Sequence, residues 1–143
     1  KFRGNCGSFA PEARIALYEG MLPLVCERAT DTELAALAAN IATLEAAIRA
    51  GESAQRPQLA YDFYHLLGEC SHNTAIIYLN DSLARILLEY TLLLSPQQRM
   101  PAGDLLASRR RFLKHLQARN AQKAMEELRR HLRRTHRALW EGR

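Results

Sequence analysis

The sequence predicts an all-α fold, an antiparallel bundle of about six helices, from two observations. The 143 residues include only seven glycines and five prolines, and no segment alternates polar and apolar residues as a half-buried β-strand would. Apolar residues instead recur every three or four positions along stretches separated by short polar breaks. Helices joined by such short loops pack as antiparallel neighbours.

The first two helices have distinct start signals. The first is expected from Pro11 to about Arg28, with Pro23 inside it removing one backbone hydrogen bond. The second follows Thr30 and Glu33, which have the spacing of a capping box. Its apolar stripe consists of Leu34, Leu37, Ile41, Leu44 and Ile48.

The third and fourth helices meet at a polar break. Pro57 fits the first turn of the third helix, which should end near residues 71–73, and Asn73 can cap the fourth. From Ala75 to Leu94 apolar residues occupy nearly every side of the predicted helix. We therefore expect this helix to be buried, either in the centre of the bundle or in a subunit interface.

The fifth helix is expected from about Ala102 to Ala118, and Asn120 can cap the sixth. On the fifth helix Arg109 shares a stripe with apolar side chains, so it should point inward. The stripe consists of Leu105, Arg109, Phe112 and Leu116. A buried guanidinium costs free energy unless an anion pairs with it. The anion would be a protein carboxylate or an acidic ligand, and a third option is that Arg109 extends its head to solvent at the stripe's edge.

Composition excludes several classes of protein. The longest apolar concentration, from Leu83 to Leu94, contains two charged residues, so a transmembrane span is not expected. The three cysteines, Cys6, Cys26 and Cys70, form no CxxC pair, which argues against a zinc finger or a disulfide framework and for a cytoplasmic protein. Nucleophile elbow, phosphate loop and HExxH motifs are missing from the sequence, so an enzyme is not expected.

Positive charge gathers at the carboxyl end. Residues 109–143 hold 12 of the 20 basic residues and only three acidic ones. Five of these basic residues fall on the polar face of the sixth helix, a pattern typical of a solvated surface: Arg129, Arg130, Arg133, Arg134 and Arg137. The alternative is a nucleic-acid or protein interaction module that acts through this face without a small-molecule effector.

Two histidines could belong to a site. On the third helix Asp62 and His65 lie on a polar stripe that is either a solvated face or the lining of a cavity inside the bundle. His131 lies at the margin of the apolar face of the sixth helix, as a core-edge histidine or as a ligand. Spacing alone does not choose between these interpretations.

A succession of short segments resembles a known family. Their sequences are EAR at 12–14, ERATDTEL at 27–34, FYHLL at 63–67, SHN at 71–73, NAQKA at 120–124 and HL at 131–132. Together they resemble the FCD domain, the effector-binding carboxyl-terminal domain of GntR-type transcription regulators of the FadR subfamily, in its shorter VanR-like variety. The resemblance covers about Pro11 to Trp140.

The resemblance implies a function and a domain organisation. Residues 1–10 would be a linker remnant from a missing amino-terminal winged-helix domain that binds operator DNA, and residues 11–143 the helical effector-binding domain. The protein would be a homodimer, with no membrane partner. A small organic acid entering the bundle would change operator affinity allosterically.

The resemblance also implies candidate ligands. Many members hold a divalent metal, often zinc or nickel, and His65 and His131 match two of its ligands. Tyr61 and Arg109 stand where an Asp and a His would be, and a guanidinium repels a cation. We therefore expect Arg109 and Arg14 to bind the effector's carboxylate directly, with Tyr61, His65 and His131 completing the polar lining. The alternative is a metal bound by His65 and His131 with Asp62.

Overall fold

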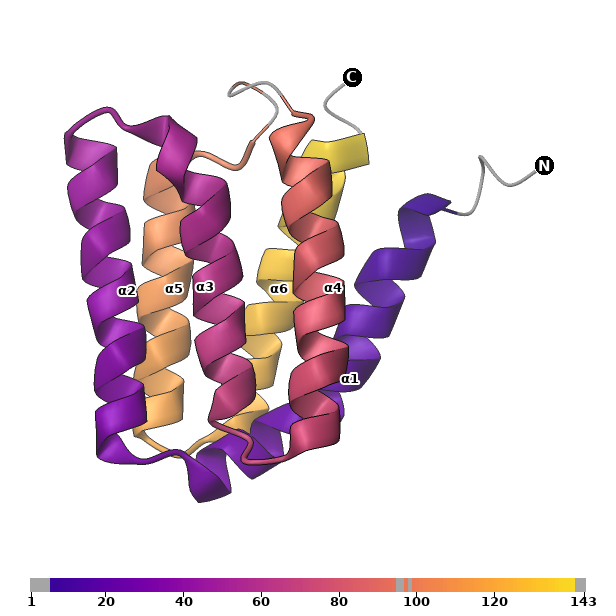
Figure 1. Cartoon of the computed structure of the whole chain (residues 1–143), viewed down its shortest axis with the longest axis vertical. Coiled ribbons are helices and arrows are strands. Elements are labelled where there is room, and N and C mark those ends of the chain that lie inside the picture. The colour runs from indigo at the N-terminus through magenta and orange to yellow at the C-terminus, as the bar shows by residue number, and fades with distance from the viewer. Residues whose placement is uncertain (1–5, 95–96, 98, 141–143) are drawn as a thin grey trace.

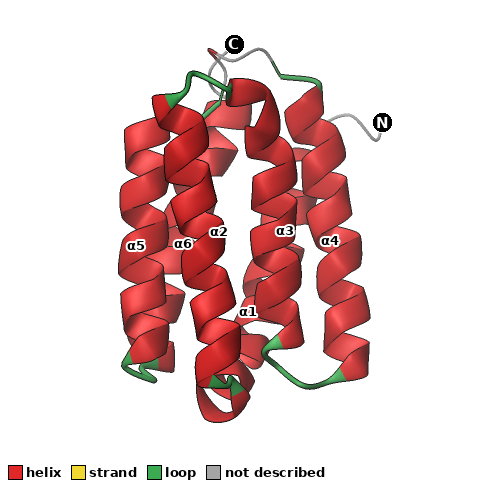
Figure 2. Cartoon of the chain, turned by 60° about the vertical axis from the view of Figure 1, so that its left-hand side comes forward, coloured by secondary structure: helices red, strands yellow, loops and turns green. Residues whose placement is uncertain are grey.

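The computed structural model describes residues 6–94, 97 and 99–140. Within these residues the chain forms six α-helices, one short 3-10 turn and no strand, which confirms the all-α prediction (Figure 1). The elements are α1 (Cys6–Arg28), α2 (Asp31–Arg49), η1 (Ser53–Gln55), α3 (Arg56–Glu69), α4 (Thr74–Leu92), α5 (Ala102–Gln117) and α6 (Ala121–Trp140). Helices α2 to α6 stand roughly upright beside one another, and α1 runs obliquely past them (Figures 1 and 2).

Local capping signals mark the helix starts. Thr30 and Glu33 form the expected capping box: the backbone N–H of Thr30 donates to Glu33 Oε1 at 2.9 Å, and that of Glu33 to Thr30 Oγ1 at 3.1 Å. Asn73 accepts from the backbone N–H of Ile76, and Asn120 accepts from that of Lys123. Each bond satisfies an N–H that has no partner inside its helix.

The first helix begins earlier than the sequence predicts. α1 starts at Cys6 rather than near Pro11, and it continues through Pro23 to Arg28. Residues 6–10 of the expected linker 1–10 are thus helical, and residues 1–5 lie outside the described part of the chain. Proline is tolerated in a first turn but does not require the helix to begin there.

The fourth helix is not buried in the centre of the bundle. Of the two alternatives expected for it, that one is wrong. Only Asn80 and Ala84 of α4 are buried. Six large apolar side chains on α4 and at its C-cap are exposed, and we call them the α4 face: Tyr78, Leu79, Ile86, Tyr90, Leu92 and Leu93. α4 packs mainly against α3 and contacts α1 less, so one side of it is left open.

The contact between α3 and α4 is close because Gly68 has no side chain. A Cβ atom at this position would lie 2.6 Å from Asn80 Nδ2. The Asn80 amide is fully buried and donates to the backbone oxygen of Tyr64 at 2.6 Å. The pair fixes the register between the two helices.

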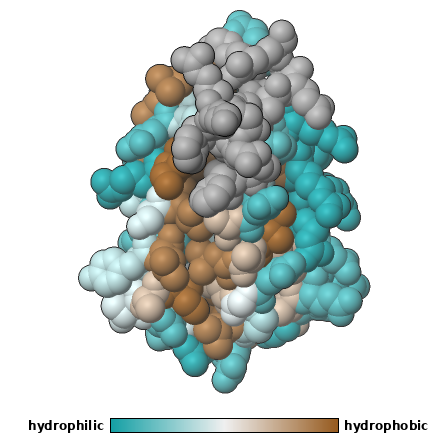
Figure 3. Space-filling model, turned by 90° about the vertical axis from the view of Figure 1, so that its right-hand side faces the viewer, coloured by the Kyte–Doolittle hydropathy of each residue, from teal (hydrophilic) through white to brown (hydrophobic). Residues whose placement is uncertain are grey.

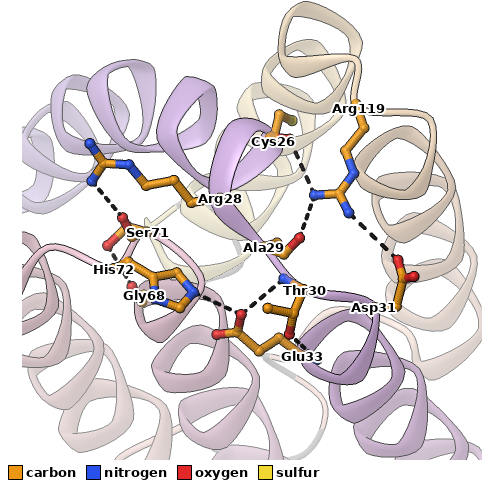
Figure 4. Close-up of polar contacts among 10 residues, drawn as sticks. All are labelled: Cys26, Arg28, Ala29, Thr30, Asp31, Glu33, Gly68, Ser71, His72 and Arg119. Atoms are coloured by element: carbon orange, nitrogen blue, oxygen red, sulfur yellow. Dashed lines mark hydrogen bonds and ion pairs between the residues drawn. The ribbon is translucent and has the colours of Figure 1, made fainter.

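A polar network ties three turns together at one end of the bundle (Figure 4). From the α5–α6 turn, Arg119 donates to the backbone oxygens of Cys26 and Ala29 at 3.2 and 2.6 Å. From the α3–α4 turn, His72 Nε2 lies 2.8 Å from Glu33 Oε1. Arg119 and His72 both have positive φ, a conformation that costs a non-glycine residue about 1 kcal/mol. Their side chains supply contacts that glycine lacks.

Among the described residues, none of the helices is long and apolar enough to cross a membrane.

Candidate functional site

Two arginines from different helices meet around one buried tyrosine. Arg14 of α1 and Arg109 of α5 are each only 4% exposed. Their guanidinium carbons lie 4.6 and 5.0 Å from the ring centroid of Tyr64 on α3. Arg109 also stacks on Phe63 at 4.0 Å, and Arg14 Nη2 donates to the hydroxyl of Tyr18 at 3.3 Å. Aromatic faces thus provide most of the surroundings of both cations.

Neither arginine forms an ion pair with a carboxylate in the described part of the chain. Arg14 Nε, Arg109 Nε and Nη1, and the Tyr64 hydroxyl are buried and have no hydrogen-bond partner there. Burial lowers the pKa of Arg109, and the charge of Arg14 lowers it further, yet a guanidinium stays protonated. The site therefore holds two uncompensated positive charges, which an anion would stabilise.

His131 of α6 joins this cluster as a neutral group. Burial, with the charges of Arg109 and Arg14, holds the pKa of His131 well below its ordinary value of 6.5. The ring is 8% exposed, its Nδ1 has no partner, and its Nε2 is 3.5 Å from Thr135 Oγ1. A neutral imidazole with a free nitrogen can accept or donate a hydrogen bond, depending on its tautomer.

Arg109 and His131 line a cavity of about 80 Å³. The cavity lies at the end of the bundle opposite the Arg119 network, where α3 begins and α4 ends. Its lining is Arg56, Pro57, Ala60, Tyr64, Leu87, Thr91, Leu94, Arg99, Met100, Leu105, Arg109, His131 and Thr135. It contains no acidic side chain among the described residues. A partly apolar cavity with a few convergent cations suits a small organic anion.

The structure does not bring every expected residue to this cavity. Arg14 lies behind Tyr64 and does not line the cavity. His65 and Tyr61, expected in the lining, are not among the residues that line the cavity. His65 Nδ1 is 2.9 Å from Asp81 on α4, its Nε2 is 3.1 Å from Glu69, and the ring of Tyr61 stacks beside it. Hydrogen bonding to Asp81 raises the pKa of His65.

The three ligands of the metal alternative do not lie together in the described residues. In the described residues, no group of three or more His, Cys, Asp or Glu side chains is arranged to hold a metal ion. Asp62 accepts a hydrogen bond from Gln58 at 2.9 Å, and His65 is engaged with two carboxylates. His65, His131 and Asp62 therefore do not form one site.

Sequence reasoning missed Tyr64, Arg56 and Arg99. The signal for Tyr64 was available, because Pro57, Ala60 and Tyr64 are spaced by three and four residues and so share one face of α3. Arg56 and Arg99 come from distant parts of the chain. Local periodicity carries no information about their meeting.

Ion pairs engage three arginines of the basic face of α6. Arg129 pairs with Glu19, Arg130 with Glu127, and Arg134 with Asp104. These pairs reduce the free positive charge that a nucleic-acid interface would use, and they favour the interpretation of a solvated face.

Comparison with known proteins agrees with this architecture. The model of the FCD domain matches residues 11–134. A solved structure, Streptococcus agalactiae GntR, superposes with a TM-score of 0.77 at 23% sequence identity, over 96% of this chain and 60% of that one. The chain thus spans about three fifths of the length of this structural neighbour. No curated protein matches the sequence. With its helices in this arrangement and the family model covering nearly all of it, the chain belongs to the FCD domain family.

Proposed function

We propose that this chain is the effector-sensing domain of a GntR-type transcription regulator and that its effector is a small organic acid. One observation carries the proposal: Arg14 and Arg109 are buried without a carboxylate partner, and Arg109 faces a cavity. A domain that serves only as a structural bundle would gain nothing from two such charges. Family membership and the similarity to a protein named GntR support the regulatory role.

In this proposal the effector's carboxylate binds at Arg109 and His131. Arg109 Nε and Nη1 are free donors, and charge-assisted bonds from a guanidinium to a carboxylate are among the strong hydrogen bonds of proteins. Arg14 adds charge from behind Tyr64 and holds the tyrosine ring in place. The bound anion supplies the missing counter-ion, and no bond of the ligand is made or broken. The proposed role of the site is therefore allosteric rather than catalytic.

We propose that the α4 face joins two copies of the chain. Leu79, Ile86, Tyr90 and Leu93 share one side of α4 at spacings of seven, four and three residues. A band of hydrophobic surface runs along the side of the molecule formed by α1 and α4 (Figure 3). An exposed apolar surface of this kind marks an interaction site.

Charges on α4 favour a second copy as the occupant of this face. Arg85 and Glu89 are exposed and form no ion pair within the described part of the chain. In an antiparallel pairing of two α4 helices about a two-fold axis near position 87, Arg85 of one copy lies opposite Glu89 of the other. A two-fold interface requires this kind of self-complementary pattern.

The regulator as a whole would bind operator DNA through a separate amino-terminal domain. The effector would act by binding one of two dimer arrangements more tightly than the other, which shifts their populations. α4 can connect the two sites, because Leu87 and Thr91 line the cavity while the neighbouring Ile86 and Tyr90 belong to the α4 face.

A thermal-shift screen of small carboxylates tests the effector proposal. We expect at least one acid to raise the unfolding temperature of the unchanged protein, because a ligand that binds only the folded state stabilises it. The same acid should have no effect on Arg109→Met and a full effect on Lys114→Met, an exposed change on the same helix. Equal responses of the two variants would contradict the proposal.

A further inference from the structure

A second pair of cations lines the same cavity, at its outer end. Arg56 is the first residue of α3, and Arg99 lies in the segment that leads to α5. Neither forms an ion pair with an acidic residue in the described part of the chain. Burial lowers the pKa of Arg56, and the neighbouring charge of Arg99 lowers it further. Two like charges thus face one space without a counter-ion.

The hydrogen bonds of this pair leave donors unused. Arg56 Nη2 donates to the backbone oxygen of Met100 at 2.7 Å. The bonds of Arg99 to the backbone oxygens of Ser53 and Leu94 are long, at 3.4 Å each. The Nε groups of both arginines are buried and have no partner. Backbone contacts hold the two side chains in place but leave their charges uncompensated.

The cavity therefore has two positive ends and an apolar middle. Arg109 and His131 form the inner end, and Arg56 and Arg99 form the outer end. On α3, Arg56 and Tyr64 are eight residues apart, which is about 12 Å along the helix axis. A ligand that contacts both ends must span part of this length.

We propose that the ligand of this cavity is a dianion, a short dicarboxylate with an apolar linker, rather than a monocarboxylate. This inference rests on the proposed function, because its first carboxylate occupies the site at Arg109. The second carboxylate pairs with Arg56 and Arg99 and relieves their mutual repulsion. The apolar walls between the two ends, which include Pro57, Ala60 and Leu87, exclude a strongly polar linker.

Calorimetric titration with matched acids tests the inference. Succinate and glutarate are compared with butyrate and pentanoate, which have the same carbon chains and one carboxylate fewer. A hydrogen bond between a guanidinium and a carboxylate is among the strong ones in proteins. We therefore expect the dicarboxylates to bind about tenfold tighter than the monocarboxylates, or more. Arg99→Met should reduce dicarboxylate affinity toward that of the monocarboxylates and change monocarboxylate affinity by less than about twofold.

The two proposals fail in different ways. Equal affinity for both classes of acid, unchanged by Arg99→Met, would overturn the proposal of a dicarboxylate ligand. If Arg109→Met abolished that binding, the proposed effector site at Arg109 would still hold. Binding of neither class would overturn both. Arg56→Met serves as the second variant at the outer end and should reproduce the effect of Arg99→Met, while Lys114→Met should bind as the unchanged protein does.

Discussion

Replacing Arg109 by methionine should stabilise the empty protein while abolishing its response to ligand. The guanidinium is 4% exposed and has no carboxylate partner, so the folded state bears a desolvation cost that the unfolded chain does not. Methionine has a similar length, no charge and a flexible side chain that can fill the same space between Phe63 and Tyr64.

The size of the effect follows from two opposing contributions. Removing an uncompensated buried charge recovers several kcal/mol of desolvation. Against it stand the contacts of the cation with the rings of Phe63 and Tyr64, each worth up to about 2 kcal/mol when desolvated. We expect a net gain of about 1 kcal/mol, which in a chain of this length raises the unfolding temperature by about 3 °C.

Urea denaturation and thermal unfolding of the empty protein measure this gain, with Lys114→Met as the matched control. A loss of about 3 kcal/mol in Arg109→Met would show that the cation stabilises the fold and would refute the reasoning. So would an unfolding temperature that still rises with the effector acid, since the ligand would then bind without Arg109.

Three further changes test other parts of the structure. Because the pKa of buried His131 lies below 6.5, the unfolded state takes up the proton first as the pH falls. The free energy of unfolding should therefore decrease below about pH 6.5, and it should decrease less in His131→Leu. Urea denaturation at several pH values measures this difference. Gly68→Ala places a methyl group against Asn80 and should cost about 2–4 kcal/mol of unfolding free energy, whereas Gly20→Ala, with open space around it in α1, should gain up to about 1 kcal/mol; equal effects would argue against the close contact. Arg85→Glu should shift dimers toward monomers in light scattering, and the added change Glu89→Arg should restore them; a dimer that is indifferent to both would place the interface elsewhere.

Much of the fold could be predicted because its signals are local. Thr30 with Glu33, and Asn73 and Asn120 with the residues three positions on, bond within a single turn, so the sequence contains all that these caps require. The exposure of α4 is a different kind of property. An all-round apolar helix must be covered, but its sequence does not say whether its own chain or another copy covers it.

The candidate site was predictable only in part, for a geometric reason. Arg109 could be oriented from its own helix because its apolar neighbours define the inward side. Tyr64 and His65 are consecutive and point about 100° apart, so the one that reaches the cavity depends on how α3 is rotated against α4 and α5. The Gly68–Asn80 contact sets that rotation, and the family resemblance favoured the neighbour that faces Asp81 instead. Arg56 and Arg99 meet through folding of segments 43 positions apart.

The two ends of the bundle differ in a way that bears on the proposed allostery. At one end Arg119, Arg28 and His72 join the α1–α2, α3–α4 and α5–α6 turns by hydrogen bonds, so α4 is anchored where it begins. At the other end α4 borders the cavity through Leu87 and Thr91, and the groups facing it from α3 and α5 include unpaired arginines. In the proposed mechanism, an anion that neutralises these charges would relieve the repulsion between them. The far end of α4 would then move about its anchored start, and Tyr90 and Leu93 on the α4 face would move with it. A ligand that binds one position of α4 more tightly thereby selects one arrangement of the dimer.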